Sequence, residues 1–553
     1  MKDLHTDLAL RYFNYLAKRF PVMCASDEFH FLPRAEVASE YYDQLDDLRA
    51  GVIDECIGTL NEFQKEFSIF EDRENDLEKF IDVKLLQANV AGILIELEKD
   101  QSWRHNPLLY LKIAFIGLDH ALTKPVTEPG ERMERVFARL YAIPRLLNQA
   151  IDNIDSVPET YHKAAHAMLR DCKRYLAETI MGFPDVSSGN LTRGVQKTLS
   201  ALDAFGKFLC SISPVPDRRF TARSLEARLN DNFLSARSLA EVYQMAVDDL
   251  RGNLEQLEKL QSKIDPNKSW EELYHAFRPS DVEKMDTISL YQREIEQLRR
   301  FFSKHDFRDN DLNSSLELTE TPAYLQSVRS AASFCAAFSA DAREKSFFYI
   351  TPHLPRQRIK EEAPLKKRLH REFKFLTAHE TIPGHHLLDS IRRRLENPVR
   401  RQIESPFFYE GWAYYAESLL TEYGYVDSPM ERLVDYKRRL WRSARCQIDV
   451  GLPMGALDRE DAIRVLTATG FTQEEAKRQI YRFQLNPGYQ LCYSLGRYEI
   501  VKLKEAYGTR MGRERFHTHL LEGGELPFHL IGKRLEALYP SDATNRQRSG
   551  NKD

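Results

Sequence analysis

The spacing of apolar residues along the chain is mainly that of α-helices. Residues 250–264 place Leu or Ile at every third or fourth position, and residues 433–448 carry a second stripe of this kind. Strand-like alternation is short and rare, and its best example is residues 346–354. The pattern predicts a mostly α-helical protein with room for one small β ribbon, which we expect near the segments that carry the chemistry.

Helix starts are marked by capping boxes, in which Ser or Thr is followed by Glu three residues later. They occur at Ser269, Ser280 and Thr472, and each satisfies backbone N–H groups that a helix start leaves free. We expect an N-terminal helical region over residues 1–340 and a C-terminal catalytic region over residues 341–540, fused in one body. The polar tail is expected to be flexible over residues 541–553.

Composition and charge narrow the class of protein. The 553 residues are 42% hydrophobic and 11% aromatic, which is typical of a globular protein, and the formal net charge is −4. A nearly neutral chain without a nucleic-acid motif gives no reason to expect a nucleic-acid partner. The seven scattered cysteines include no C-x-x-C pair, which is typical of free thiols in a reducing compartment. With no signal peptide and no run of ~18 apolar residues, we expect a cytoplasmic protein without a membrane partner.

The stretch FLTAHETIPGHHLLDS, residues 375–390, begins like the zinc-binding helix of a metalloprotease and then departs from it. His379 is followed by Glu380, but Pro383 occupies the place of the second histidine in the H-E-x-x-H motif. On a regular helix His385 is ~9 Å from His379 along the axis, whereas two ligands of one zinc are only ~3–4 Å apart. A break at Pro383 can bring the histidines together, or it can simply end the helix. Both interpretations stay open at this point.

A second segment offers a third ligand. ESPFFYEGWAYYAESLL, residues 404–420, begins with Ser405-Pro406, a good helix start, and places Glu410 and Glu417 among aromatic residues. The two carboxylates are seven residues apart and share a helix face, and burying them is costly unless they are paired or bind a metal. Glu410 is the better candidate for a ligand. Glu417 is either a carboxylate that orients a histidine or half of a buried ion pair with an arginine.

Together these motifs resemble a known family. The pattern H-E-x-x-P-G-H-H, followed by a helix with E-G-W-A-x-Y-x-E, is similar to the bacterial proteins called domain of unknown function 885, which look like relatives of the gluzincin metallopeptidases. The resemblance continues through RSARCQIDVGL, YRFQLNPGYQLCYSLG and FHTHLLEGGELP, and covers at least residues 375–530. It implies a large multi-helical, metallopeptidase-like fold with a deep cleft. In that fold His379, His385 and Glu410 bind zinc and Glu380 is the base.

Three positions depart from the family pattern. Leu388 stands where Gln is usual, Tyr489-Gln490 replaces a common Gln-Ala pair, and Pro453 stands where a histidine is expected. The candidate metal ligands are intact, but a substrate or transition-state contact is expected to be lost at Pro453, and this weakens the case for ordinary peptidase turnover.

Further candidate residues come from the C-terminal segments. The resemblance points to Tyr493 as a site residue, and its phenol is our first candidate for a donor to a developing oxyanion, with Tyr489 as the second. Arg445, Arg482 and Arg497 lie in the same segments. Each of them either binds a substrate carboxylate or neutralises a buried acid.

Other histidines and a basic stretch have simpler interpretations. His386 lines the cleft or caps the broken helix if its neighbour His385 is the ligand. His517 and His519 face different ways on a predicted helix, which favours structural roles over a second metal pair. The basic stretch at residues 390–402 predicts a solvated face.

The sequence therefore predicts a zinc-dependent hydrolase of peptide or amide bonds, with one Zn²⁺ per chain and a peptide or small amide as substrate. Two histidines and one carboxylate also suit iron, so iron is the alternative metal. One alternative function is a specialised metal-dependent enzyme that acts on a small molecule in a biosynthetic pathway. Another is a metal-binding relative without catalysis, although the retained base Glu380 argues against it.

Overall fold

The computed structural model confirms that the chain is mostly α-helical. The described residues are 4–71, 74–128, 130–182, 189–217, 221–279, 285–338, 341, 343–352 and 359–540. Within them, no helix is both long and apolar enough to cross a membrane. The tail at residues 541–553 lies outside the described residues.

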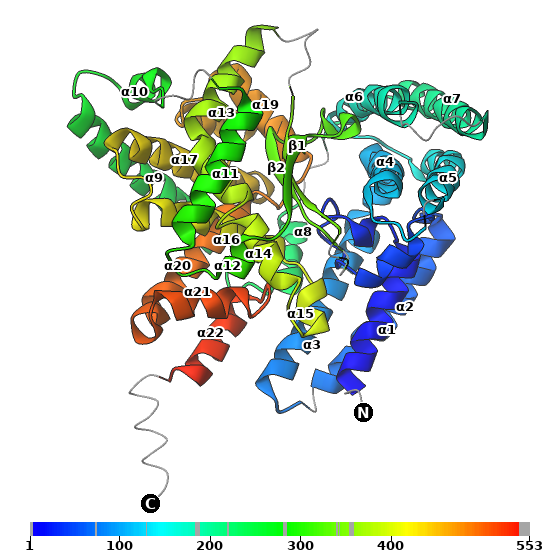
Figure 1. The fold of residues 1–553 in the computed structure, drawn as a ribbon, viewed down its shortest axis with the longest axis horizontal. Helices are drawn as coiled ribbons and strands as arrows, with labels where there is room; N and C mark the ends of the chain where they lie inside the picture. Colours follow the sequence, from blue (N-terminus) through cyan, green and yellow to red (C-terminus); the bar gives the residue numbers. More distant parts are fainter. Residues whose placement is uncertain are drawn as a thin grey trace, which may run out of the picture. The chain divides into compact units, whose positions relative to one another are not determined.

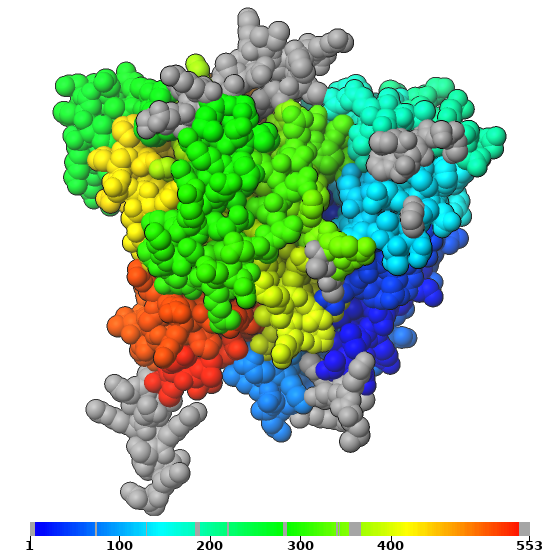
Figure 2. Space-filling model, viewed as in Figure 1, coloured from blue at the N-terminus to red at the C-terminus, as the bar shows by residue number. Residues whose placement is uncertain are grey.

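The chain forms two compact units, each built from several stretches of sequence. Unit 1 comprises Met1–Phe70, Asn89–Phe220 and Ser315–Arg358, and unit 2 comprises Glu71–Ala88, Thr221–Ser314 and Ile359–Asp553. Figure 2 shows how distant segments meet at the surface of unit 2, where residues 221–314, in green, adjoin C-terminal segments in yellow and orange. Unit 2 thus draws on both sides of residue 340, and the boundary expected there stays a prediction.

Unit 1 is a helical body with one small sheet. Its α-helices are α1 (Leu4–Arg19), α2 (Ala50–Glu71), α4 (Pro107–Thr123), α5 (Glu131–Asn153), α6 (Glu159–Tyr175) and α7 (Gly189–Ser211). Its short helices are η1 (Met23–Ala25), η2 (Glu36–Tyr41), η3 (Ile95–Asp100), η4 (Ser102–Arg104), η5 (Leu176–Ile180) and η7 (Ala323–Leu325). Helices α4 to α7 pack against one another (Figure 1), and α4 is buried along almost its whole length because it is apolar on nearly every side.

The sheet of unit 1 has three strands in the order β1-β3-β2. They are β1 (Leu316–Glu320), β2 (Ala332–Cys335) and β3 (Ser346–Ile350). The central strand β3 pairs in parallel with β1 and antiparallel with β2, so that Phe348 lies opposite both Leu318 and Phe334. The strand predicted within residues 346–354 is confirmed. Because the sheet belongs to unit 1 and the candidate ligands to unit 2, its nearness to the site stays a prediction.

Unit 2 contains the remaining helices. They are α8 (Ala222–Ala227), η6 (Arg228–Asn232), α9 (Leu239–Ile264), α10 (Trp270–Ala276), α11 (Thr287–Phe302), α12 (Asp309–Leu312), α13 (Ile359–Glu380), α14 (His385–Arg392), α15 (Pro398–Gln402), α16 (Pro406–Glu422), α17 (Pro429–Met454), α18 (Arg459–Thr467), α19 (Gln473–Gln484), α20 (Leu491–Met511), α21 (Arg513–Leu521) and α22 (Phe528–Leu538). Helix α3 (Leu77–Leu94) has residues in both units.

The predicted stripes and caps account for several of these helices. The two apolar stripes form α9 and α17, which pack along each other. Capping boxes at Ser269 and Thr472 start α10 and α19 as predicted. The box predicted at Ser280 lies outside the described residues.

The prediction of a solvated basic face at residues 390–402 is wrong for two of its arginines. Arg392 and Arg400 are buried, with 4% and 6% of their surface exposed. Arg392 pairs with Asp389 at 2.5 Å, and Arg400 pairs with Asp82 at 2.7 Å. Asp82 comes from a stretch more than 300 residues earlier that folds into the same unit, so the local sequence could not reveal it.

Candidate metal centre

The chain reverses sharply between α13 and α14, at the Pro-Gly pair. The N–H of Gly384 donates to the carbonyl of Ala378 at 2.9 Å, and the N–H of Leu387 donates to that of Thr381 at 3.2 Å. A Cβ atom at position 384 would lie 2.0 Å from the carbonyl oxygen of His379. Only glycine fits there, because the turn folds directly back onto the end of α13.

This reversal brings His385 to His379. Their rings lie 4.8 Å apart, centroid to centroid, in an edge-on arrangement with an interplanar angle of 78°. His386 points elsewhere: its Nε2 lies 2.9 Å from the hydroxyl of Ser314. Of the two adjacent histidines, His385 is therefore the one that joins His379.

Helix α16 is fixed against this turn and against α20. The indole N–H of Trp412 donates to the carbonyl of Pro383 at 3.0 Å. A Cβ atom at Gly411 would lie 2.6 Å from the Cα of Gly496, so these two glycines let α16 and α20 approach closely. Their neighbour Glu410 is thereby held beside the histidines.

Three ligand-type atoms converge at this point. Glu410 Oε2 lies 3.4 Å from His379 Nε2 and 3.5 Å from His385 Nε2. Atoms of all three residues lie within 4.8 Å of one another, and no other such group of His, Cys, Asp or Glu occurs in the described part of the chain. Ligands of one zinc ion, each at ~2.0–2.2 Å, are separated by distances of this order.

The other polar atoms of two ligand residues are engaged. His379 Nδ1 lies 2.9 Å from Glu417 Oε1, and the hydroxyl of Tyr489 donates to Glu410 Oε1 at 2.6 Å. The buried Oε2 of Glu410 makes no hydrogen bond to any described residue. Each of these two residues thus has one atom fixed from outside and one that faces the centre, which fits a metal ion with its outer supporting groups.

Electrostatics keep the carboxylates of the centre ionised. Burial raises the pKa of Glu410, but His379 and His385 outweigh it and hold this pKa well below the usual range. Burial lowers the pKa of His379, but its interactions with Glu410 and Glu417 raise it to about 9. The charge of Glu380, which directly follows His379 and is 9% exposed, acts in the same direction.

Two arginines that sequence reasoning missed hold Glu417 in place. Arg438 donates to its oxygens at 3.1 Å through Nε and Nη2, and Arg442 donates at 3.1 Å through Nη1. Arg438 also donates to the fully buried Glu372 at 2.6 Å. The available signal was a pair of arginines four residues apart on α17, but nothing local shows which acids they meet.

The two predicted tyrosines occupy different places. The ring of Tyr493 stacks on that of His379 with centroids 6.1 Å apart and an interplanar angle of 17°. Tyr489 instead supports Glu410 through its hydroxyl. Both tyrosines are partly exposed, whereas His379, His385 and Glu410 are buried. The tyrosines therefore lie on the accessible side of the centre.

The three predicted arginines also differ in their surroundings. The guanidinium carbon of Arg445 lies 4.1 Å from the ring centroid of Tyr493, beside the centre. Arg497 donates to the hydroxyl of Ser418 at 3.2 Å, and Arg482 is exposed on α19. The structure thus connects Arg445 to the centre through Tyr493.

The positions that depart from the family pattern have plain structural roles. Leu388 is buried on α14 with 1% of its surface exposed. Pro453 lies inside the last turn of α17, where it has no N–H to donate. Gln490 accepts from Arg445 Nε at 3.0 Å, so the Tyr489-Gln490 pair binds both Glu410 and Arg445.

His517 and His519 do not act as a pair. His517 is fully buried, with Nε2 2.9 Å from the hydroxyl of Tyr415 and Nδ1 2.9 Å from Asp306 Oδ2. His519 Nε2 lies 3.0 Å from the hydroxyl of Tyr539. These separate contacts are those of structural histidines.

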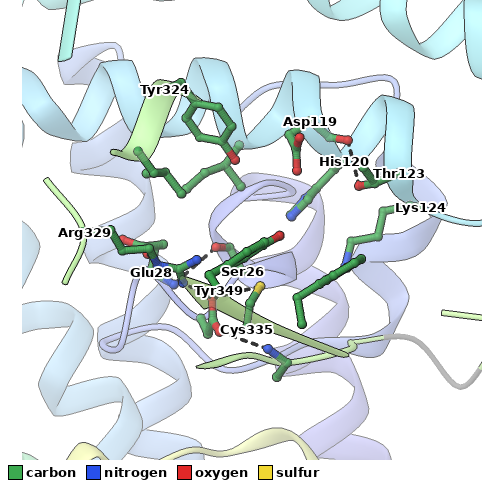
Figure 3. Close-up of a pocket in the computed structure, with 15 residues that line it drawn as sticks. Ser26, Glu28, Asp119, His120, Thr123, Lys124, Tyr324, Arg329, Cys335 and Tyr349 are labelled. Atoms are coloured by element: carbon green, nitrogen blue, oxygen red, sulfur yellow. Dashed lines mark hydrogen bonds and ion pairs between the residues drawn. The ribbon is translucent and has the colours of Figure 1, made fainter. Parts of the chain in front are cut away.

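Unit 1 contains a separate polar cavity, shown in Figure 3. Several of its charged groups are already paired: Glu28 lies 3.0 Å from Arg329 and 2.7 Å from Lys112, and Lys124 forms an ion pair with Glu344. Asp119 accepts from the hydroxyl of Tyr175 at 2.8 Å, and the ring of His120 points into the cavity. Because its described residues do not bring two histidines and a carboxylate together, the cavity is a weaker candidate for metal chemistry than the centre in unit 2.

Comparison with known proteins shows a shared fold. A protein described as "a putative lipoprotein of unknown function" from Shewanella oneidensis is 18% identical, with a TM-score of 0.71, and the match covers 96% of this chain and all of the other. A second, "the putative lipoprotein from Colwellia psychrerythraea", is 16% identical, with a TM-score of 0.75 and coverage of 97% and 98%. No match is found among curated proteins.

The family comparison agrees with the motifs and reaches beyond them. The family described as "Bacterial protein of unknown function (DUF885)" matches residues 34–535. This range includes all three converging ligand residues and most of both units. The chain therefore belongs to the bacterial family called domain of unknown function 885.

Proposed function

We propose that this protein is a zinc-dependent hydrolase of peptide or amide bonds. The observation that carries the proposal is the convergence of His379 Nε2, His385 Nε2 and Glu410 Oε2 within 4.8 Å. A buried carboxylate oxygen that faces two imidazole nitrogens is costly unless a proton or a cation joins them. Two imidazoles and one carboxylate are also the ligand set of zinc hydrolases that keep a position open for water.

Zinc bound there supplies a Lewis acid that lowers the pKa of water to ~7 and polarises a carbonyl group. Glu380 takes the proton of the attacking water and passes it to the leaving nitrogen, because it adjoins a ligand and lies at the end of α13. Tyr493 donates a hydrogen bond to the oxyanion from the accessible side. Tyr489, whose hydroxyl is bound to Glu410, orients that ligand instead.

The proposal extends to the architecture. Buried ligands beside partly exposed Tyr489, Tyr493 and Arg445 support a site that opens on one side, as in a cleft. A mostly helical scaffold with this ligand order resembles the gluzincin metallopeptidases. An experimental structure with a bound peptide analogue tests this part, since the analogue should lie against Tyr493.

Metal analysis tests the centre directly. We expect about one zinc ion per chain in the purified protein and almost none in His379→Ala, His385→Ala and Glu410→Ala, because three ligands are needed for tight binding. His386→Ala is the matched control, since His386 faces Ser314, and it should keep its metal. Elemental analysis also separates zinc from iron. A wild-type protein that neither carries nor takes up metal contradicts the proposal.

Cleavage assays test the chemistry after the metal is established. A peptide library incubated with the wild type should yield products that Glu380→Gln, with its metal intact, does not produce. Equal cleavage by the two proteins would remove Glu380 from its role as base.

A second function rests on the departures at Leu388, Pro453 and Tyr489-Gln490. These favour a specialised metal-dependent enzyme that cleaves an amide in a small molecule. Full metal occupancy with small amides cleaved and peptides left intact would select it. A metal-bound protein that cleaves neither class would be a binding relative without catalysis.

Two observations bear on the proposed cytoplasmic location. All seven cysteines are free, which supports the proposal of a cytoplasmic protein. The two structural relatives are each described as a "putative lipoprotein", so they do not themselves support a cytoplasmic location. Fractionation of cells that express the full-length protein tests the cytoplasmic location.

A further inference from the structure

Arg445 differs from the other arginines near the centre in its partners. Arg438 and Arg442 bind the carboxylate of Glu417. Arg445 donates to a neutral group, the amide oxygen of Gln490, at 3.0 Å through Nε and also through Nη2. In the described part of the chain, no carboxylate forms an ion pair with its guanidinium. Arg445 is thus a cation beside the centre without an acid to neutralise it.

Asp449, an acid that feels the charge of Arg445, is held by backbone groups. Asp449 accepts from the backbone N–H of Gly488 at 2.9 Å and from that of Leu491 at 3.0 Å. Its role is therefore to start α20, which carries Tyr493, rather than to pair with Arg445. The positive charge remains available to a bound anion.

Aromatic rings hold the guanidinium flat and leave an edge for a ligand. Its carbon lies 4.1 Å from the ring centroid of Tyr493 and 4.8 Å from that of Trp441. Gln490 is 6% exposed and occupies two of the five N–H groups of Arg445, and Tyr493 is a further hydrogen-bond partner, so at least one N–H group remains for a ligand. A planar fork held in this way suits bidentate binding of a carboxylate.

Arg445 lies beside the path that a substrate would take to the candidate ligands. Tyr493 touches both the ligand His379 and Arg445. Arg445 and Tyr493 are partly exposed, while the ligands are buried. A substrate whose amide carbonyl reaches the ligands from this side therefore passes beside Arg445 with its neighbouring groups.

We propose that Arg445, oriented by Gln490, binds the free carboxylate of the substrate, so that the protein acts on short peptides or amides that end in a carboxylate near the scissile bond. The inference rests on the proposed hydrolase function and gives its substrate class: C-terminal trimming or dipeptide cleavage rather than cleavage inside long chains.

The test uses binding as well as turnover. Metal-loaded Glu380→Gln protein is mixed with a tripeptide library as free acids and with the same library as C-terminal amides, and retained peptides are measured by mass spectrometry. We expect the free acids to bind about tenfold to a hundredfold more tightly, which is typical of a charge-assisted hydrogen bond. Adding Arg445→Met should remove that preference, and adding Gln490→Ala should reduce it.

The controls separate this inference from the hydrolase proposal. Arg464, an exposed arginine on the neighbouring α18, provides Arg464→Met, which should keep the preference for free acids. Metal content, measured on the same samples, reports whether the centre is intact. Equal retention of acids and amides, including retention of neither, would overturn the role of Arg445. If the wild-type protein holds its metal and cleaves amidated peptides or internal peptide bonds, the hydrolase proposal is supported. In that case only the proposed substrate class is wrong.

Discussion

Units 1 and 2 each bury a cluster of charged side chains, and the clusters differ in how their carboxylates are satisfied. In unit 1, Glu28 lies 2.7 Å from Lys112 and 3.0 Å from Arg329, so both positive partners come from the protein. In unit 2, Glu410 directs Oε2 at the Nε2 atoms of two histidines and makes no hydrogen bond with that oxygen to any described residue. The first arrangement is complete without a ligand, whereas the second fits a cation.

Helix α16 contains both arrangements seven residues apart. Glu417 is bound by Arg438 and Arg442, like the acids of unit 1, while Glu410 faces the histidines. Burial alone therefore does not mark a functional carboxylate, because both side chains are buried. The groups that face the carboxylate do mark it: a guanidinium keeps its charge and neutralises an acid, whereas an imidazole can give up its proton and share the acid with a metal.

The largest effect should come from the base. Glu380→Gln should keep the metal and the fold but lose about 10²–10⁴-fold in kcat, because an amide cannot accept the proton of the attacking water. Steady-state kinetics with metal analysis on the same preparation checks this. A rate within a few-fold of the wild type would show that the centre in unit 2 is no more catalytic than the ion pairs in unit 1.

Breaking an ion pair in unit 1 should cost stability and leave the metal in place. Lys124→Met leaves Glu344, 4% exposed, without its ammonium partner. We expect a loss of about 3–5 kcal/mol in the free energy of unfolding, the usual cost of an uncompensated buried charge. Urea denaturation checks this, with Lys124→Met/Glu344→Gln as a control that should recover part of the loss. If Lys124→Met has the same urea midpoint as the wild type, or loses its metal, then the two clusters do not differ in how their carboxylates are satisfied.

The pH dependence of stability should reveal Glu28. Burial raises its pKa, but Lys112 and Arg329 outweigh this and lower it from 4.5 to about 2. Because the folded-state pKa lies below the unfolded one, the stabilisation is present above pH 4.5 and is lost as the pH falls towards 2. At pH 7 we expect the free energy of unfolding of the wild type to exceed that of Glu28→Gln by about 3 kcal/mol. Urea midpoints of both proteins between pH 7 and pH 3 should converge, and a constant difference would contradict this.

Outer support of a ligand should matter less than the ligand itself. Glu417→Gln should lower metal affinity about 10–100-fold, because Glu417 orients His379 through Nδ1 at 2.9 Å. Competition with a chelator measures this affinity. The change also removes the negative charge that Arg438 and Arg442 share, although Arg438 keeps its ion pair with Glu372. Asp435→Asn, which removes the acid partner of Arg439 on the same helix, therefore serves as a matched control. Equal metal loss in both variants would indicate a general disturbance of α17.

Local patterns predicted the helices, the family resemblance indicated the candidate ligand residues, and tertiary contacts decided the rest. The stripe along α17 and the cap at Thr472 depend on residues close in sequence, so they could be read directly. The helix break at Pro383 and the nearby Glu410 left a metal site open, and the family resemblance selected His379, His385 and Glu410, which the structure brings together. Tyr489 was assigned to the oxyanion because its hydroxyl partner, 79 residues away, is not visible in sequence.

The contacts that shape the site were hidden for the same reason. Gly411 and Gly496 look like ordinary helix residues until α16 and α20 cross, and only their contact explains why neither carries a side chain. Arg438 and Arg442 belong to a helix whose stripe was read as core, and the acids they bind come from other helices. Such pairings cannot be deduced from spacing along one element.

Variants of the two tyrosines test which groups support the candidate metal centre, and we expect their effects to be smaller than those of the other variants. Tyr489→Phe removes the hydrogen bond to Glu410 Oε1, and we expect a loss of metal affinity of about tenfold, the lower end of the value of one hydrogen bond to a charged group. Tyr493→Phe should keep the metal and lower kcat instead, because its ring stacks on His379 and the residue is partly exposed beside the centre. Chelator competition and kcat, measured on both variants, separate the two roles. If Tyr489→Phe lowers kcat at full metal occupancy while Tyr493→Phe has no effect, the oxyanion donor is Tyr489, and Glu410 holds its place without that bond.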